Sequence, residues 1–366
     1  MVGFFRGARC LREATRPVNQ GTRHLEKSKT PPAAASPREW ARILAPYREP
    51  SHGRSIFELV VTAGPFAALW FLMWAVLGSS YWLSLALALP TAGFLVRLFM
   101  IQHDCGHGSF FRHRLVNDWV GRILGALTLT PYDFWRHTHA IHHASSGDLG
   151  RRGIGDITTL TVQEYLALSA CGRLRYRLYR NPIVMFGVGP AYLFLVQHRL
   201  PIGGMRREWV PWLSTMGTNV GIALLVAAVV CFTGARPFLM VHLPVILLAA
   251  SIGVWLFYVQ HQFEDTFWAD TPRWTFHEAA LHGSSYYDLP QVLRWFTANI
   301  GLHHVHHLSS RIPYYRLPRV LRDHPELEGI GRLTLLQSLG CVRLVLWDEE
   351  RQRLISIREL RRAHMT

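Results

Sequence analysis

Three short segments of this sequence are dense in histidine. Their spacings are H-x3-H at His103 and His107, H-x2-HH at His139, His142 and His143, and H-x2-HH at His303, His306 and His307. On a helix, residues three or four positions apart share one face, so each segment would direct several imidazoles the same way. Imidazoles without thiolates or several carboxylates suit first-row transition metals rather than calcium or magnesium. The three segments therefore indicate one shared, dinuclear metal centre.

A ligating imidazole uses one ring nitrogen, and its other nitrogen needs a hydrogen-bond partner that fixes the tautomer. Asp104 adjoins His103, and Asn299 lies four residues before His303, where a helix would place both on one face. The remaining acidic candidates for such a partner are Asp148, Asp156, Glu264 and Asp265.

The five cysteines stand singly, and no two have C-x-x-C spacing. This pattern indicates neither a disulfide framework nor a zinc or iron–sulfur site. Cys105 lies between His103 and His107 but would point away from their face of a helix, which favours packing over ligation. His137 and His304 also lie off the ligand face, and we interpret them as supporting or structural residues.

The elements that must position these histidines are four long apolar runs. They extend over about 56–78, 81–101, 213–232 and 238–260. Each is close to the ~20 residues that cross a bilayer as a helix. Glu58 and Arg97 lie near the ends of their runs, where we expect them to reach lipid headgroups. A soluble protein with four buried helices is the alternative, but such helices rarely run so long.

The resulting fold prediction is an all-α integral membrane protein. Four transmembrane helices would carry a cytoplasmic helical cap that holds the histidine-rich dimetal site. Two shorter apolar segments, 117–130 and 182–196, are too short to span and predict interfacial helices. Residues 1–37 are polar and Arg-rich and predict a disordered tail, with an organelle transit peptide as the alternative. A single domain would then cover 38–345, and 346–366 would be a charged C-terminal tail.

The net charge of +15 is distributed unevenly along the chain. Eleven Lys and Arg precede the first run and thirteen Arg separate the second from the third, whereas the short turns within each pair of runs contain only Arg236. This is the positive-inside pattern, which places both termini and all three histidine segments on the cytoplasmic side. Nothing in the sequence resembles a basic recognition helix or an aromatic strand platform, so we expect no nucleic-acid partner.

The three segments and their flanks resemble the histidine boxes of the membrane fatty acid desaturase family. The resembling stretches are HDCGHGS at 103–109, WRHTHAIHH at 135–143 and NIGLHHVHH at 299–307. They closely resemble the branch of acyl-lipid desaturases of the delta-12/omega-6 type, and the resemblance covers roughly residues 50–325. Three boxes at this spacing are a specific pattern, whereas a single H-x2-HH would be weak.

The resemblance implies a centre of two non-haem iron ions that uses O2 to insert a cis double bond into an acyl chain of a membrane lipid. It places the ligands on the eight box histidines and a ninth on His261, with His277 and His282 as competitors for that position. The sequence carries no haem motif or ferredoxin cysteine run, so electrons would come from a separate ferredoxin or cytochrome b5-like protein. The implied location is the bacterial inner membrane.

Two alternatives remain at this stage. A hydroxylase or other oxygenase of lipid, carotenoid or sphingolipid would share the same boxes. A non-redox metal-binding membrane protein or transporter belongs to a different class. Transporters place ionisable residues inside their spans, whereas here only His242 among the histidines lies inside an apolar run.

Overall fold

The computed structural model describes residues 36–153, 155–201 and 209–363. The expected disordered tail, and the transit-peptide alternative with it, lie outside the described residues apart from their last two positions. Ser36 caps the first helix, α1 (Pro37–Leu44), by accepting a hydrogen bond from the backbone N–H of Glu39.

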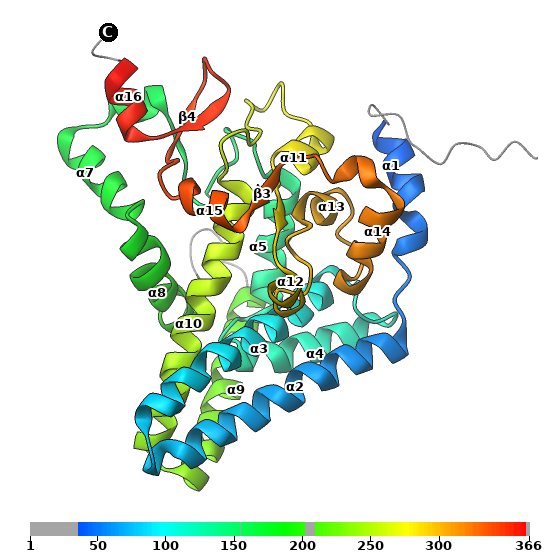
Figure 1. Ribbon diagram of the computed structural model, residues 1–366, viewed down its shortest axis with the longest axis vertical. Coiled ribbons are helices and arrows are strands. Elements are labelled where there is room, and N and C mark those ends of the chain that lie inside the picture. The colour runs from blue at the N-terminus through cyan, green and yellow to red at the C-terminus, as the bar shows by residue number, and fades with distance from the viewer. Residues whose placement is uncertain (1–35, 154, 202–208, 364–366) are drawn as a thin grey trace, which may run out of the picture.

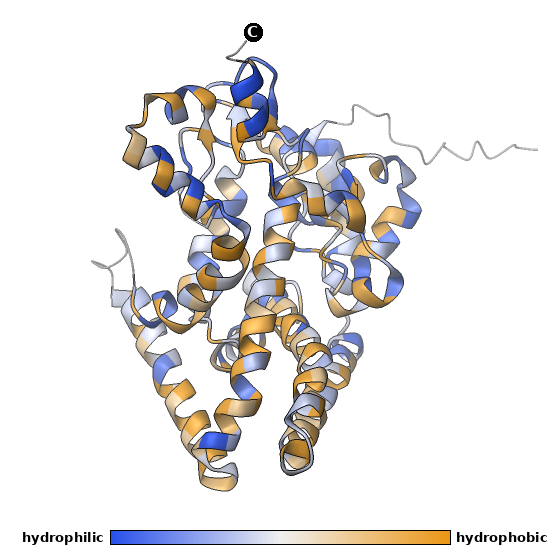
Figure 2. Ribbon diagram, turned by 60° about the vertical axis from the view of Figure 1, so that its left-hand side comes forward, coloured by the Kyte–Doolittle hydropathy of each residue, from blue (hydrophilic) through white to orange (hydrophobic). Residues whose placement is uncertain are grey.

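Four long helices form one end of the molecule (Figure 1). They are α2 (His52–Ala75), α3 (Tyr81–His107), α9 (Trp209–Thr233) and α10 (Ala235–His261), and a 3₁₀ turn (Val76–Gly78) extends α2. Each is long and apolar enough to cross a membrane. Colouring by hydropathy shows apolar residues along these helices and polar residues at the opposite end (Figure 2). The four predicted membrane helices are therefore confirmed, although α2 begins four residues early and α3 continues through the first histidine segment.

Lipid-facing and protein-facing helices differ within this bundle. Along α9, Leu213, Leu224 and Phe232 are exposed, as expected for a helix whose surroundings would be acyl chains. By contrast, α3 is largely buried and packs against α2, α10 and α4 (Arg114–Leu127). It ends at Gly108, whose φ of +65° gives the left-handed C-cap that glycine adopts without strain. The central helix thus carries His103 and His107 to the edge of the apolar bundle.

Two charged residues, Glu58 and Arg97, lie within the first two predicted apolar runs, and they are not at headgroup level as expected. Glu58 and Arg97 are buried and form an ion pair between α2 and α3. Arg97 also donates from Nε to Thr62 Oγ1 at 3.1 Å, and the Tyr314 hydroxyl donates to Glu58 Oε2 at 3.1 Å. A charge pair with these added hydrogen bonds can be accommodated away from water, which is why neither side chain needs to reach the surface.

Shorter elements form the cap at the other end. The helices are α5 (Tyr132–Ser145), α6 (Val162–Ala167), α7 (Ala170–Tyr179), α8 (Gly189–Leu195), α11 (Phe276–His282), α12 (Gln291–Phe296), α13 (His303–Leu308), α14 (Leu317–Asp323), α15 (Leu335–Cys341) and α16 (Ile357–Ala363). Short turns of 3₁₀ or π type cover Ala45–Tyr47, Val184–Val188, Gln197–Arg199, Tyr314–Arg316 and Pro325–Leu327. The two segments expected to be interfacial are helical, as α4 and as the π turn followed by α8.

The few strands are short. Strand β1 (Leu160–Thr161) runs parallel to β4 (Leu346–Asp348), which pairs antiparallel with β5 (Arg353–Ile355). Strand β2 (Tyr286–Asp288) runs parallel to β3 (Arg332–Thr334). The fold is therefore predominantly helical, and these strands only fasten loops of the cap to one another.

The expectation of a charged tail over 346–366 is wrong as far as residue 363. This segment supplies β4, β5 and α16, and Leu346, Leu354 and Leu360 are buried. Leu346 and Leu360 pack in one cluster with Tyr165 and Tyr176. Trp347 and Ile355, the strand neighbours of Leu346 and Leu354, are buried as well, and the charged residues gather in the turn between β4 and β5. The net charge of the segment therefore gave no sign of its buried strands.

Candidate metal centre

Nine imidazoles converge where α3 and α10 end. They form two groups, one of His103, His107, His139, His143 and His306, and one of His142, His261, His303 and His307. Within each group the ligand nitrogens lie within 4.8 Å of one another. The rings of His143 and His307 stack at a centroid distance of 4.1 Å, so the two groups are directly adjacent. All nine residues proposed as ligands from the sequence are therefore brought together.

The first group consists of Nε2 atoms that face one point. The Nε2 of His139 lies 3.1 Å from that of His107 and 3.1 Å from that of His143. The Nε2 atoms of His143 and His306 are also 3.1 Å apart. His103 completes this group, with its ring centroid 4.6 Å from that of His306.

The second group has the same spacing. The Nε2 of His261 lies 3.2 Å from that of His142 and 3.0 Å from that of His303. The Nε2 atoms of His303 and His307 are 3.1 Å apart. His261 is the last residue of α10, and it joins this group, whereas the competitors His277 and His282 lie on α11 and belong to neither group.

Helical periodicity explains how two identical motifs serve two groups. In α5, His139 and His143 are four residues apart and face the first group, while His142 points to the second. In α13 the outer pair, His303 and His307, faces the second group, while His306 points to the first. Each H-x2-HH motif thus gives two ligands to one group and one to the other, because a three-residue step turns a helix 60° short of a full circle.

The donor set tests which metals fit. Closed tetrahedral zinc takes four ligands, whereas the first group alone offers five imidazole nitrogens. Imidazoles without thiolates suit first-row transition metals, so the residues of the two groups fit ions of that class, which they would hold.

Two of the proposed partner carboxylates do contact ring nitrogens. Asp156 Oδ1 lies 2.5 Å from His142 Nδ1, and Asp104 Oδ1 lies 3.2 Å from His103 Nδ1. His261 Nδ1 has the Gly283 carbonyl at 3.0 Å instead. These contacts fix Nε2 as the nitrogen that faces each group.

Two further partner candidates, Asp265 and Asn299, do not contact the ligand histidines. Asp265 is exposed, because α10 ends at His261 and the chain turns away before residue 265. Asn299 has a φ of +56° and donates from Nδ2 to the Tyr314 carbonyl at 3.3 Å. Since α13 begins only at His303, the helical four-residue rule does not apply to Asn299. Both expectations failed because a helix boundary fell between the partner and its histidine.

The remaining sequence candidates have structural contacts. Asp148 accepts hydrogen bonds from Arg151 and Thr271, and Glu264 pairs with Arg353. His304 is buried with its Nε2 3.0 Å from the Leu327 carbonyl. His137 is exposed on α5, and Cys105 is buried outside both groups.

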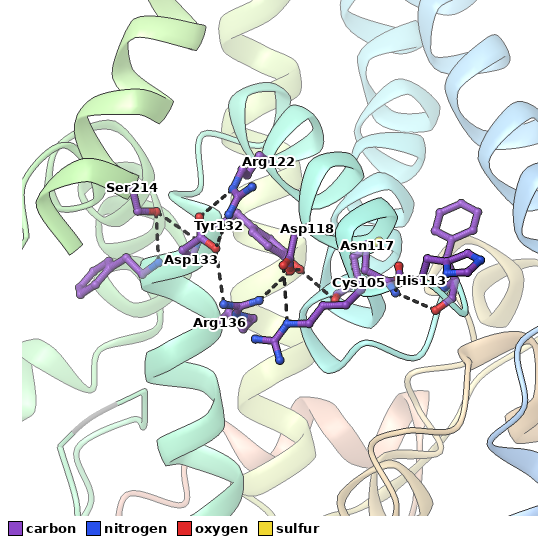
Figure 3. A network of polar contacts seen from close by, with 12 residues as sticks. Cys105, His113, Asn117, Asp118, Arg122, Tyr132, Asp133, Arg136 and Ser214 are labelled. Atoms are coloured by element: carbon purple, nitrogen blue, oxygen red, sulfur yellow. Dashed lines mark hydrogen bonds and ion pairs between the residues drawn. The ribbon is translucent and has the colours of Figure 1, made fainter. Parts of the chain in front are cut away.

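A polar network that the sequence reading missed fastens α5 to its neighbours (Figure 3). The Tyr132 hydroxyl donates to the Cys105 carbonyl of α3 at 2.9 Å, and Arg136 donates to Asp118 of α4 at 2.7 Å. Ser214 Oγ on α9 accepts the backbone N–H of Asp133 at 3.1 Å, close to the start of α5. Helix α5 is therefore held by three other helices, which fixes where its histidines point. Ser214, a polar residue in the third apolar run, was a sign in the sequence that this run makes a polar contact.

Close packing adds to this support. The Trp135 ring stacks on His139 at a centroid distance of 4.6 Å. A Cβ at Gly106 would lie 2.9 Å from the Trp135 ring, and one at Gly121 would lie 2.2 Å from the Tyr132 ring. Both glycines are needed for the close approach of α3 and α4 to α5.

Replacing Asp156 tests the contact to His142. The Asp156→Asn variant keeps the shape but removes the charge that orients the ring, so we expect metal affinity to fall about 10- to 100-fold. Metal content after dialysis against graded chelator concentrations measures this loss. Asp265→Asn changes an exposed carboxylate in the loop that follows α10, and this variant should behave as the parent. Equal metal retention by both variants would show that Asp156 does not support the centre.

Burial shapes the acid response of the site. Burial, and the neighbouring imidazoles after it, lower the pKa of His143, His306 and His307 well below the usual 6.5. These rings stay neutral in the folded protein, whereas in the unfolded chain they take up protons below about pH 6.5. The free energy of unfolding therefore decreases as the pH falls through 6.5, and bound metal acts in the same direction. Melting temperatures recorded from pH 8 to 5.5 should drop in that window, and a flat profile would contradict the prediction.

The sequence of this chain is similar to those of several known proteins. A family model described as fatty acid desaturase matches residues 80–334. A fatty acid desaturase of Bacillus subtilis (strain 168) is 44% identical over 324 residues, which cover 88% of this chain and 92% of that protein. The sn-1 oleoyl-lipid 12-desaturase of a Synechocystis species is 29% identical over 224 residues, covering 61% and 63%. The sn-1 acyl-lipid omega-3 desaturase (ferredoxin) of the same organism is 27% identical over 296 residues, covering 74% and 75%.

Proposed function

Because this chain belongs to the fatty acid desaturase family, we propose that it inserts a cis double bond into an acyl chain of a membrane lipid, using O2 at a centre of two iron ions. The single observation that supports this most directly is the pair of adjacent imidazole groups. The proposed ligands are His103, His107, His139, His143 and His306 for one ion, and His142, His261, His303 and His307 for the other.

Iron is proposed because the donor set is all imidazole and one group offers five nitrogens, more than closed tetrahedral zinc takes. Bound iron would activate O2, which would take two hydrogens from adjacent methylenes and two electrons, with two protons, from the electron donor, and would leave as two water molecules. The residues of the chain hold the ions in place, keep the ligand nitrogens deprotonated and exclude water.

The approach of the acyl chain is suggested by the aromatic residues beside the imidazoles. Phe257 lies one turn before His261 on α10, and its ring is 5.1 Å from that of His142. On α3, Phe99 lies one turn before His103 and contacts Trp135 at 5.5 Å. Both phenylalanines are on the membrane side of the groups. An acyl chain that enters there would meet apolar walls, while its headgroup stays at the wetter end.

The finer assignments rest on relatives and on charge. We propose a delta-12/omega-6 position for the double bond, since one relative is named an sn-1 oleoyl-lipid 12-desaturase. Another relative's name specifies ferredoxin, which supports a separate ferredoxin or cytochrome b5-like electron donor here. We propose a bacterial inner-membrane location, as relatives from bacteria suggest. The positive-inside pattern supports an orientation with the metal centre and both termini in the cytoplasm.

Fatty-acid methyl ester profiling tests this function. A host that makes the intact protein is compared with one that makes the His142→Ala variant, each with a ferredoxin and its reductase. A new unsaturated species only with the intact protein is expected, and derivatisation gives its double-bond position. A product that gains oxygen without losing two hydrogens would show that the protein is a hydroxylase and not a desaturase. Unchanged acyl, carotenoid and sphingolipid profiles despite bound metal would favour a non-redox metal-binding role.

A further inference from the structure

A second candidate site lies away from the metal centre, in the cap. A half-open cavity of about 560 Å³ is lined by α7, by the end of α15 and the chain that follows it, and by α16. These elements lie together at the C-terminal corner of the molecule (Figure 1). The volume is within the range of about 300–1,000 Å³ that small-molecule sites occupy. Its charged lining consists of Arg177, Arg180, Arg343, Arg358, Arg362 and Glu359.

The positive charge of this lining is not neutralised by the protein. None of the five arginines has a carboxylate within 4.0 Å among the residues that the structure describes. The one acidic residue, Glu359, is already engaged, since its Oε2 accepts hydrogen bonds at 2.8 Å from both the backbone N–H and the hydroxyl of Ser356. Its Oε1 lies 3.4 Å from Arg353, which is outside the lining. The cavity therefore carries a large excess of positive charge.

Arg180 differs from the other four arginines of the cavity because it is buried. Its side chain is buried, and its Nη atoms donate only to neutral acceptors, including the Leu344 carbonyl at 2.9 Å and Gln262 Oε1 at 2.8 Å. Its Nε is buried and has no hydrogen-bond partner in the described chain. A buried cation without a counter-ion is costly, and buried charges are normally paired. An anion in the cavity would supply the missing charge and an acceptor for the guanidinium.

The number of guanidinium groups indicates the class of anion. Each presents a planar fork of donors that suits the oxygens of a phosphoryl or carboxylate group. A carboxylate offers two oxygens, whereas a phosphoryl group offers more acceptor sites and can carry a second charge, so it can engage several guanidiniums at once. We propose that this cavity is a binding site for a phosphoryl group, with Arg180 at its base and the exposed arginines at its mouth.

Two sources of that group fit the surroundings. The outer face of α7 exposes Leu174 and Leu178, as an interfacial helix would, so an anionic phospholipid headgroup could reach the cavity. A soluble phosphate compound would use the same arginines. In either case Arg180 links the cavity to the metal end of α10. Besides Gln262 it contacts the Tyr258 hydroxyl at 3.1 Å, and these residues flank His261.

Titration calorimetry on the purified full chain in neutral detergent tests this site. The probes are inorganic phosphate, dihexanoylphosphatidylglycerol and, as a zwitterionic comparison, dihexanoylphosphatidylcholine, all at constant ionic strength in chloride. The cavity variant Arg177→Gln/Arg358→Gln removes one guanidinium from α7 and one from α16. The control Arg175→Gln/Arg361→Gln removes the same charge from the same two helices at positions that do not line the cavity.

The cavity variant should bind the anionic probe at least about ten-fold more weakly than the parent, because charge-assisted contacts are lost. The control should bind within about two-fold of the parent, and unliganded melting temperatures should agree for all three proteins. Binding of both anionic probes would identify a general phosphate site, and binding of phosphatidylglycerol alone a lipid-headgroup site. Equal weakening in both variants, or no binding of either anionic probe to the parent, would overturn the proposal.

Discussion

Alanine at His142 or at His306 is expected to lower desaturase activity at least about 100-fold, with insertion into the membrane unchanged. Each residue supplies an Nε2 atom to one imidazole group, with neighbouring nitrogens at 3.1 to 3.2 Å. Loss even of a residue that orients a ligand costs about 10- to 100-fold in metal affinity or activity, so loss of a ligand should cost more. His139→Ala is expected to behave in the same way.

The matched control is His137→Ala, on the same helix α5 but exposed and outside both groups. It should retain near-parental activity and metal content. Iron analysis of the purified variants separates loss of metal from loss of fold, since each ligand variant should hold less iron while its elution on size exclusion stays that of the parent. Full activity in any one ligand variant would argue against a shared centre that needs both groups.

Local spacing was enough to single out the eight histidines of the three motifs, whereas His261 was proposed only from the resemblance to the desaturase family. The expectation that each motif directs its imidazoles the same way was wrong for α5 and α13, where the middle histidine joins the other group from the outer pair. Which motif pairs with which group was not readable, because it depends on how α3, α5, α10 and α13 meet in space. The partner residues show the same limit, since Asp156 lies in a loop whose course no periodic pattern dictates.

Contacts between residues far apart in the sequence also explain why the positions of Glu58 and Arg97 and the structure of the C-terminal segment were predicted wrongly. Glu58 and Arg97 are separated by 39 residues and neutralise each other only because α2 and α3 pack side by side. Likewise β4 is ordered by β1, nearly two hundred residues earlier in the chain. A short window of the sequence contains only one member of the Glu58–Arg97 pair or of the β1–β4 pair. Without its partner, a charged residue or a short strand is easily assigned to the surface.

The buried ion pair also supports the metal centre through a chain of contacts. Glu58 Oε2 accepts from the Tyr314 hydroxyl at 3.1 Å, and the backbone N–H of Tyr314 donates to Asp104 Oδ2 at 2.7 Å. Asp104 Oδ1 in turn contacts His103 Nδ1 at 3.2 Å. A change at Glu58 would therefore loosen the loop that holds the carboxylate beside a ligand histidine.

Glu58→Gln is accordingly expected to destabilise the protein by about 3–5 kcal/mol, because it leaves the Arg97 guanidinium buried without its counter-charge. Thermal unfolding in detergent measures this loss, and Glu49→Gln provides the comparison. Glu49 is exposed and paired with Arg112 at 2.8 Å, and such surface pairs contribute only about 0–1 kcal/mol. Adding Arg97→Met to Glu58→Gln removes the unpaired charge and should recover part of the stability. If Glu58→Gln melted at the parental temperature, the pair would not be buried as described, and the chain of contacts to His103 would lose its anchor.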